Sequence, residues 1–170
     1  MDIHELIRYR KSVRAWDDRP VDRSIVERIM ESARFAPSAK NGQEWRVIAV
    51  TDQSVREKLG RDIAKQPFVA EAPVVLAICG DASVGDMRCG QPRMPMDVGI
   101  LIDHITLVAA NEGLGSCWIG SFDGPGAAKL LGVPEPWEVA QLLPIGYPAD
   151  PSQITKPRKP LNEILAWEQW

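Results

Sequence analysis

The residues best suited to bind an anion form the run Arg10-Lys11-Ser12-Val13-Arg14. Side chains alternate along an extended backbone, so Arg10, Ser12 and Arg14 would share one face. Two guanidinium groups and a hydroxyl on that face supply the charge and the donors that a phosphate group needs. A second basic group lies near the end of the chain: Lys156, Arg158 and Lys159. The pattern predicts a phosphate cradle, and a solvated basic surface is the alternative.

A polar segment, residues 37–44, offers a second kind of contact. Ser38, Asn41 and Gln43 carry neutral donors and acceptors, which suit the edges of a heteroaromatic ring or a ribityl-like chain. A plain turn between a helix and a strand is the alternative. Residues 115–120 are likewise either a ligand contact or a plain turn. Their glycines would let the backbone approach a planar ligand closely, but glycines at the end of a strand also form turns.

The histidine and cysteine residues form no recognised catalytic or metal-binding pattern. His4 and His104 lie far apart, and the three cysteines lack CxxC spacing: Cys79, Cys89 and Cys117. We therefore expect reduced thiols, no metal site and no nucleophilic cysteine. His104 lies in an apolar helical pattern, where a lone histidine is expected to pack in a core or an interface. No side chain is predicted to be a catalyst.

Composition limits the class of protein. The chain has 170 residues, 45% of them hydrophobic, which predicts a single domain spanning 1–170 with a substantial core. Its 20 basic and 23 acidic side chains leave a formal net charge of -3, which argues against nucleic acid as the main partner. The first residues lack a basic segment followed by a long apolar run, so we expect no membrane anchor and a cytoplasmic location.

The elements that must position these residues follow from periodicity. The pattern predicts helices over 3–9, after Asp2 as N-cap, and from Asp22 towards Pro37. Two apolar runs predict buried strands over 45–50 and 73–79. Between them 54–65 has helical spacing, and Gln66-Pro67 is predicted to break that helix.

The second half continues the alternation. Residues 80–96 predict a long loop, and 97–111 a helix with apolar residues around much of its circumference, ended by a glycine cap at Gly113. Further elements are expected in this order: a strand over 116–120, a helix over 127–131, a strand over 139–145 and a small helix over 161–166. The pattern predicts an α/β or α+β sandwich, and no GxGxxG lies between a strand and a helix.

Six motifs in this order resemble the nitroreductase family of FMN-dependent oxidoreductases, over essentially the entire chain. They are Arg10-Lys11-Ser12-Val13-Arg14, Ala36 to Trp45, Asp97-Val98-Gly99-Ile100, Gly113 to Gly120, Pro144 to Pro148 and Arg158-Lys159-Pro160-Leu161. Two positions depart from the family pattern. Glu44 stands where proline is most frequent, and Asp103-His104 replaces the more usual Gln-Asn or Glu-Asn.

The resemblance implies an α+β fold, a three-layer sandwich whose central, mainly antiparallel sheet is flanked by helices. It also implies a homodimer of interlocked subunits with two FMN sites at the interface. The helix over 97–111 corresponds to the central dimer helix. Residues 156–170 correspond to a C-terminal arm that embraces the partner.

The resemblance also implies site residues. Those expected to hold the FMN phosphate and ribityl chain are Arg10, Lys11, Ser12 and Arg14, with Arg158 and Lys159. Those expected to line the flavin from the partner subunit are Pro37, Ser38, Ala39, Asn41 and Gln43. The backbone at Ile119 and Gly120 is expected beside flavin N5. Gln66 and Lys65 are the candidates for contact with the pyrimidine edge.

The implied activity is a ping-pong transfer of hydride from NADH or NADPH, through flavin N5, to a nitroaromatic, a quinone or a similar small acceptor. No catalytic acid or base is required. One alternative is a specialised family chemistry, reductive dehalogenation or ring oxidation, with residues 80–96 selecting the substrate. Another is a flavin-binding or flavin-sequestering protein without turnover. A third treats the chain as a dimeric module whose basic ends form interface ion pairs.

Overall fold

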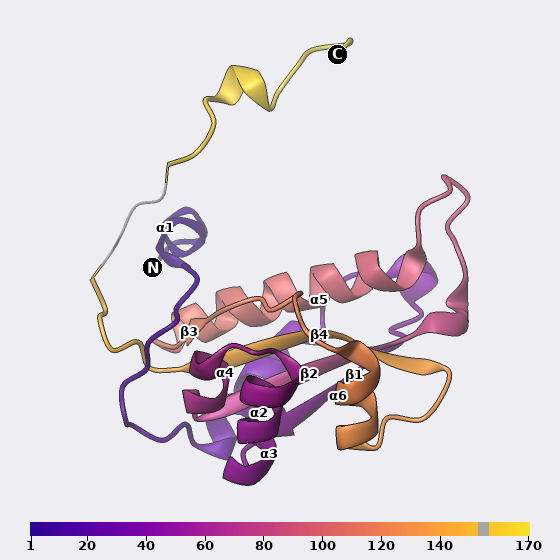
Figure 1. Ribbon diagram of the computed structural model, residues 1–170. Coiled ribbons are helices and arrows are strands. Elements are labelled where there is room, and N and C mark those ends of the chain that lie inside the picture. The colour runs from indigo at the N-terminus through magenta and orange to yellow at the C-terminus, as the bar shows by residue number, and fades with distance from the viewer. Residues whose placement is uncertain (153–156) are drawn as a thin grey trace.

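A four-stranded antiparallel sheet lies at the centre of the computed structural model, which describes residues 1–152 and 157–170 (Figure 1). The strands are β1 (Trp45–Val50), β2 (Val74–Asp81), β3 (Gly115–Ser116) and β4 (Trp137–Gly146), in the spatial order β1-β2-β4-β3. β2 is an uninterrupted apolar run because both of its faces are covered, and all its residues except Asp81 are buried.

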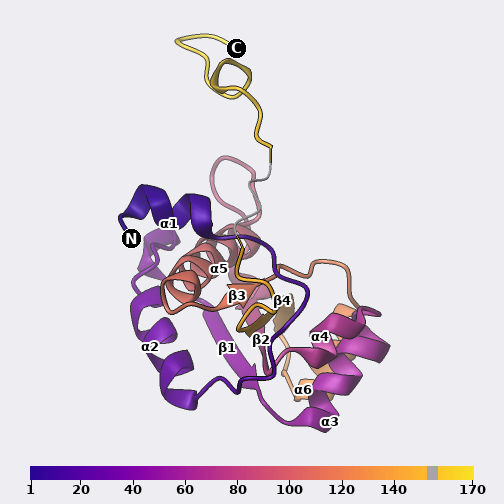
Figure 2. The ribbon, with the colours of Figure 1, turned by 90° about the vertical axis from the view of Figure 1, so that its left-hand side faces the viewer.

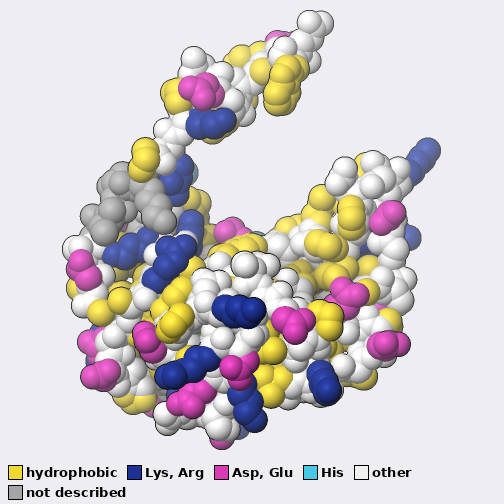
Figure 3. Space-filling view, viewed as in Figure 1, with side chains coloured by type: hydrophobic (Ala, Val, Ile, Leu, Met, Phe, Trp, Pro, Cys, Tyr) yellow, Lys and Arg dark blue, Asp and Glu magenta, His cyan; other side chains and the backbone are white. Residues whose placement is uncertain are grey.

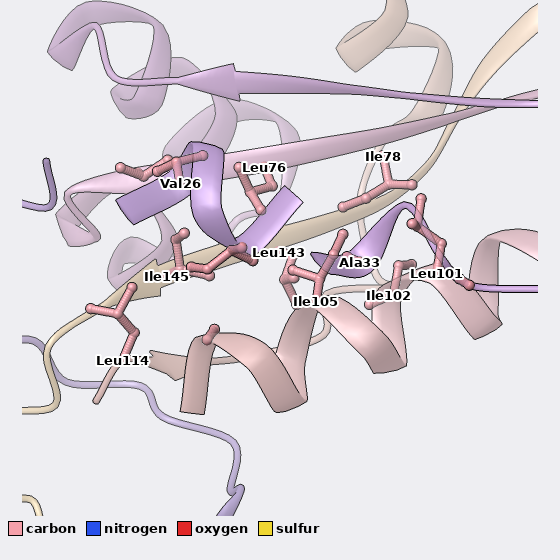
Figure 4. Packing of buried hydrophobic residues seen from close by; sticks show 14 of the residues in the cluster. Val26, Ala33, Leu76, Ile78, Leu101, Ile102, Ile105, Leu114, Leu143 and Ile145 are labelled. Atoms are coloured by element: carbon pink, nitrogen blue, oxygen red, sulfur yellow. The ribbon is translucent and has the colours of Figure 1, made fainter. Parts of the chain in front are cut away.

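One face of the sheet packs against α2 (Arg23–Ala33) and α5 (Arg93–Asn111), with α1 (Ile3–Tyr9) further out against α5. Residues of this core point from the sheet and from the two helices toward one another (Figure 4). They include Val26, Ala33, Leu76, Ile78, Leu101, Ile102, Ile105, Leu114, Leu143 and Ile145. The apolar face of α2 is therefore buried, as its amphipathic pattern predicts, and a broad apolar surface of α5 is buried with it.

The opposite face packs against short helices: α3 (Gln53–Glu57), the π-helical segment η2 (Lys58–Ile63), α4 (Pro67–Glu71) and α6 (Gly124–Leu131). Val75 and Ala77 of β2 meet Leu59 and Ala127 in this second core. The sheet therefore lies between two helical layers, and the predicted three-layer α+β sandwich is confirmed. Gln66-Pro67 does not simply break a helix, because Pro67 begins α4, where its missing N–H costs nothing.

Helix ends follow the local sequence closely. Asp2 caps α1 as predicted: its carboxylate accepts from the Glu5 N–H at 2.8 Å, and the Glu5 carboxylate accepts from the Asp2 N–H at 3.1 Å. α5 begins at Arg93, one turn before the predicted start. Among the described residues no helix has the length and apolar character needed to cross a membrane.

Gly113 ends α5 with a left-handed backbone, φ +80°. Its N–H donates to the Ala110 carbonyl at 3.1 Å, and the Leu114 N–H donates to the Ala109 carbonyl at 2.8 Å, the pair of bonds of a Schellman motif. We expect Gly113→Ala to lower the free energy of unfolding by about 1–2 kcal/mol, since a Cβ disfavours this conformation. Urea denaturation measures the loss. Gly113→Asn, which tolerates the conformation better, should lose less, and equal losses would contradict the explanation.

Three segments differ from the prediction. The strand expected over 116–120 is only Gly115–Ser116, and beyond it Ile119 forms a single bridge with Leu142. The helix expected over 161–166 is the 3₁₀ turn η4 (Leu161–Glu163), because a short apolar tail without packing does not offset the cost of helix nucleation. The loop region over 80–96 contains the end of β2, the turn η3 (Ala82–Val84) and a hairpin over 85–92 closed by the Asp86–Pro92 bridge.

Candidate functional site

The basic segment lies along the free edge of β3. Ser12 pairs with Ser116 in parallel, and the Val13 N–H donates to the Ser116 carbonyl at 2.9 Å. Val13 is buried, and a Cβ at Gly115 would lie within 2.4 Å of the Val13 side chain, so Gly115 permits this close approach. The segment is therefore held against the sheet by its backbone.

The guanidinium groups of Arg10 and Arg14 form no ion pair with any described residue. Arg14 instead lies 6.0 Å from the centre of the Phe68 ring. The Lys11 ammonium donates to the carbonyls of Asp150 and Ser152, which ties the chain after β4 to this segment. Two cations thus remain available for an anion.

Residues 117–120 present backbone donors at an open edge. The N–H groups of Cys117 and Ile119 donate to carbonyls of β4, at 3.3 Å and 2.9 Å. Because alternate N–H groups of an extended chain point to opposite edges, those of Trp118 and Gly120 face away from β4. No described residue accepts from the Gly120 N–H.

The candidates Gln66 and Lys65 lie beside this edge. The Gln66 side-chain amide donates to the Ser121 carbonyl at 3.5 Å. Lys65 is exposed and has a left-handed backbone, φ +53°. With Ser121 and Phe122 it lines a cavity of about 420 Å³. The structure thus brings residues 65–66 next to Gly120, although they are more than 50 positions apart in the sequence.

The polar loop over 37–44 contains the turn η1 (Ala39–Asn41) and is strained. Lys40, Asn41 and Gln43 have φ of 57°, 54° and 54°, in the left-handed region. Such backbone conformations of non-glycine residues cost roughly 1–3 kcal/mol each and persist where surrounding contacts impose them. Here the Ser38 hydroxyl accepts from the Gln43 N–H at 3.0 Å, and the buried Asp97 carboxylate accepts from the Ala39 N–H at 3.0 Å and 3.2 Å.

Arg93 completes the support of this loop. Its Nη2 donates to the Ala39 carbonyl at 2.8 Å and to the Glu44 carboxylate at 2.5 Å, and its Nε lies 3.5 Å from the Asp97 carboxylate. Sequence reasoning missed Arg93 and noted Glu44 only as a departure from the family pattern. Arg93 and Asp97 are four positions apart, a spacing that pairs opposite charges on one helix face. This signal could have identified the pair, but only if the helix is taken to begin at Arg93.

The strained loop and the basic segment lie at opposite ends of α5. Asp97 holds the loop, whereas Arg10 and Lys11 lie near Ala110, and 13 residues of helix separate these positions by about 20 Å. One chain therefore does not bring these two sets of predicted residues together.

The C-terminal arm, residues 157–170, extends away from the remainder of the chain in two perpendicular views (Figures 1 and 2). Arg158 and Lys159 are exposed on it, and Lys156 lies outside the described residues. Large apolar side chains on the arm are exposed: Leu161, Ile164, Leu165, Trp167 and Trp170. Figure 3 shows a wide hollow between this arm and the hairpin over 85–92.

The remaining titratable candidates are a histidine on α5 and two buried cysteines. The His104 Nδ1 lies 3.0 Å from the Ile100 carbonyl on its own helix. Cys79 and Cys117 are buried, and burial raises the pKa of the Cys79 thiol, which favours its protonated form. In residues 1–152 and 157–170, no group of three or more histidine, cysteine, aspartate or glutamate residues is arranged to hold a metal ion.

The protein is thus of the α+β class: a three-layer sandwich whose free sheet edge carries a cationic segment and backbone N–H groups without a described acceptor. The sequence profile of the nitroreductase family matches residues 7–69 and 61–147, and the chain belongs to that family. The resemblance found from the sequence motifs is thereby confirmed.

Individual relatives agree with this assignment. The FMN reductase of Bacillus subtilis, named as acting with NAD(P)H, is 31% identical, over 91% of this chain and 68% of its own. A nitroreductase family protein from Clostridium novyi NT has 28% identity and a TM-score of 0.81, covering 91% of this chain and 89% of that one. The NADPH:FMN oxidoreductase of Vibrio harveyi, solved with NAD+, has 26% identity and a TM-score of 0.87, covering 98% and 77%. The names agree with the expected oxidoreductase class.

Proposed function

We propose that the protein is an FMN-dependent oxidoreductase that takes hydride from NADH or NADPH and reduces a small acceptor such as a nitroaromatic or a quinone. The observation that carries this function is the pairing of Arg10–Arg14 along the same open edge that presents the Gly120 N–H. Family membership and the names of the relatives support it. The whole chain, 1–170, acts as one domain.

The residues present fit FMN. Arg10 and Arg14 offer charge for a phosphate without having to break an ion pair with another described residue. Ser12 adds a hydroxyl on the same segment, and Lys11, Arg158 and Lys159 add further positive charge. Further along the edge, the Gly120 N–H and the Gln66 amide supply donors for a polar ring edge.

When bound, FMN supplies the N5 atom that accepts a hydride from NAD(P)H and passes the electrons to an acceptor. The protein's own part is to hold and orient the cofactor. Arg10 and Arg14 would offset the phosphate charge. The backbone at Ile119 is bonded to β4, so Gly120 would present its N–H to the ring edge on the side away from β4. No side chain of the chain is assigned as a proton donor, so position and exclusion of water are its contribution.

We propose further that the working unit is a homodimer. The partner's loop would supply Pro37, Ser38, Ala39, Asn41 and Gln43, since about 20 Å of α5 separates these residues from the basic segment of the same chain. The arm over 156–170, with its exposed apolar side chains, would then wrap the partner subunit. We place the protein in the cytoplasm, where the proposed donors NADH and NADPH are available.

The absorption spectrum of the purified protein tests the function. We expect the bands of bound flavin, and we expect them to bleach when NADH or NADPH is added without oxygen. A colourless protein that does not take up added FMN would overturn the proposal. Bound flavin that stays oxidised with both nucleotides would instead identify a flavin carrier.

The dimer has its own prediction. Replacing Trp167 and Trp170 together by serine removes two exposed apolar side chains from the arm. We expect this variant to shift toward monomer at micromolar concentration, measured by light scattering after size exclusion, with the parental protein at the same concentration as reference. An unchanged dimer would show that the arm contributes little, and a monomeric parental protein would overturn the two-chain site.

A further inference from the structure

Gln141 of β4 lies next to a β-bulge and opposite Gly120. Ile78 of β2 pairs with Gln141, whereas the next residue, Cys79, pairs with Val139. Ala140 is therefore the extra residue of a β-bulge. Bulges redirect side chains and are frequent next to active sites.

The register places Gln141 on the sheet face that α5 covers. Its partner Ile78 and its second neighbour Leu143 both belong to the core beneath α5, whereas Leu142 belongs to the opposite core. A carboxamide on this otherwise apolar face is unexpected, and Gln141 is only half-buried. Its amide has no hydrogen-bond partner among residues 1–152 and 157–170.

Gly120 leaves the approach to this amide open. Ile119 bridges Leu142, so Gly120 stands opposite Gln141 in the same antiparallel pairing. A Cβ at Gly120 would lie 3.9 Å from both the nitrogen and the oxygen of the Gln141 amide. A planar ligand that accepts the Gly120 N–H is therefore brought next to an unpaired donor and acceptor.

We propose that Gln141 is a cofactor-contacting residue whose amide hydrogen-bonds the heteroatom edge of the flavin beside Gly120, an inference that rests on the proposed function. The backbone N–H can only donate, whereas a carboxamide can donate or accept. Flavin N5 accepts a hydrogen bond when oxidised and carries a hydrogen when reduced. Gln141 therefore matches both redox states and tunes the reduction potential of the bound flavin.

The test compares the holoprotein with Gln141→Met and Gln141→Glu. Methionine keeps the approximate shape and removes the amide, and we expect FMN to bind about 5-fold more weakly, as for loss of one hydrogen bond. Glutamate keeps the shape and adds negative charge, and we expect a lower reduction potential of the bound flavin. Fluorescence titration measures the dissociation constant, and a redox titration followed by absorbance measures the potential.

Gln53→Met is the matched control, because Gln53 is exposed at the start of α3, on the far side of the sheet from α5. This variant should leave the FMN dissociation constant and the reduction potential of the bound flavin unchanged. FMN affinity, flavin absorbance and reduction potential that are all unchanged in both Gln141 variants would overturn this assignment alone. A parental protein that binds no FMN would overturn it together with the proposed function.

Discussion

Replacing Arg93 by methionine is expected to lower the free energy of unfolding by about 3 kcal/mol, because it leaves the buried carboxylate of Asp97 and the half-buried carboxylate of Glu44 without their cation. The Arg93 side chain is 14% exposed, and those of Glu44 and Asp97 are 25% and 8% exposed. The substitution also removes the hydrogen bond to the Ala39 carbonyl. The strained loop would then relax, and we expect FMN binding to weaken as well. Urea denaturation and FMN titration measure the two effects.

Two further variants separate the effect of the positive charge of Arg93 from the effect of its planar hydrogen-bonding geometry. Arg93→Lys keeps the positive charge but loses the planar fork, so we expect an intermediate loss. Glu44→Gln combined with Arg93→Met removes one of the stranded charges, so the double variant should be more stable than the sum of the single losses predicts. An Arg93→Met protein as stable as the parental protein would contradict the role given to this network.

Replacing Arg10 and Arg14 together by alanine is expected to raise the FMN dissociation constant by about 100-fold or more, because each charge-assisted hydrogen bond contributes roughly 1.5–3 kcal/mol. Neither guanidinium forms an ion pair with a described residue, so thermal stability without FMN should change little. Flavin fluorescence titration at fixed ionic strength measures the affinity, since screening by salt alters such contacts.

Arg23→Ala is the matched control for this pair. Arg23 is exposed at the start of α2 and pairs only with Glu27, at 2.7 Å, in the salt bridges of the described residues. Its removal should leave FMN affinity unchanged. A double variant at Arg10 and Arg14 that retains parental affinity would remove the phosphate assignment from this segment, and the arm residues Arg158 and Lys159 would become the next candidates.

Elements with a strong local pattern were predictable. The apolar run of β1 and the caps of α1 and α5 depend on neighbouring residues, and the structure has them where the pattern indicates. The short strand and the C-terminal helix were wrong for one shared reason. Whether an apolar stretch becomes a strand or a helix depends on a partner. Of the described residues that follow Ser116, only Ile119 forms a bridge with β4, and every residue of the arm over 157–170 is exposed.

The sequence by itself determined which functional groups the protein can offer: the cations of Arg10–Arg14, the polar loop over 37–44 and the glycines near Gly120. The order of these motifs also identified the nitroreductase family. Only the tertiary structure decided which of these groups meet. The Arg93–Glu44 pair joins positions 49 apart, and the closeness of Gly120 to Gln141 depends on the bridge between Ile119 and Leu142. Such contacts follow from strand register and helix packing, which local residue patterns do not specify.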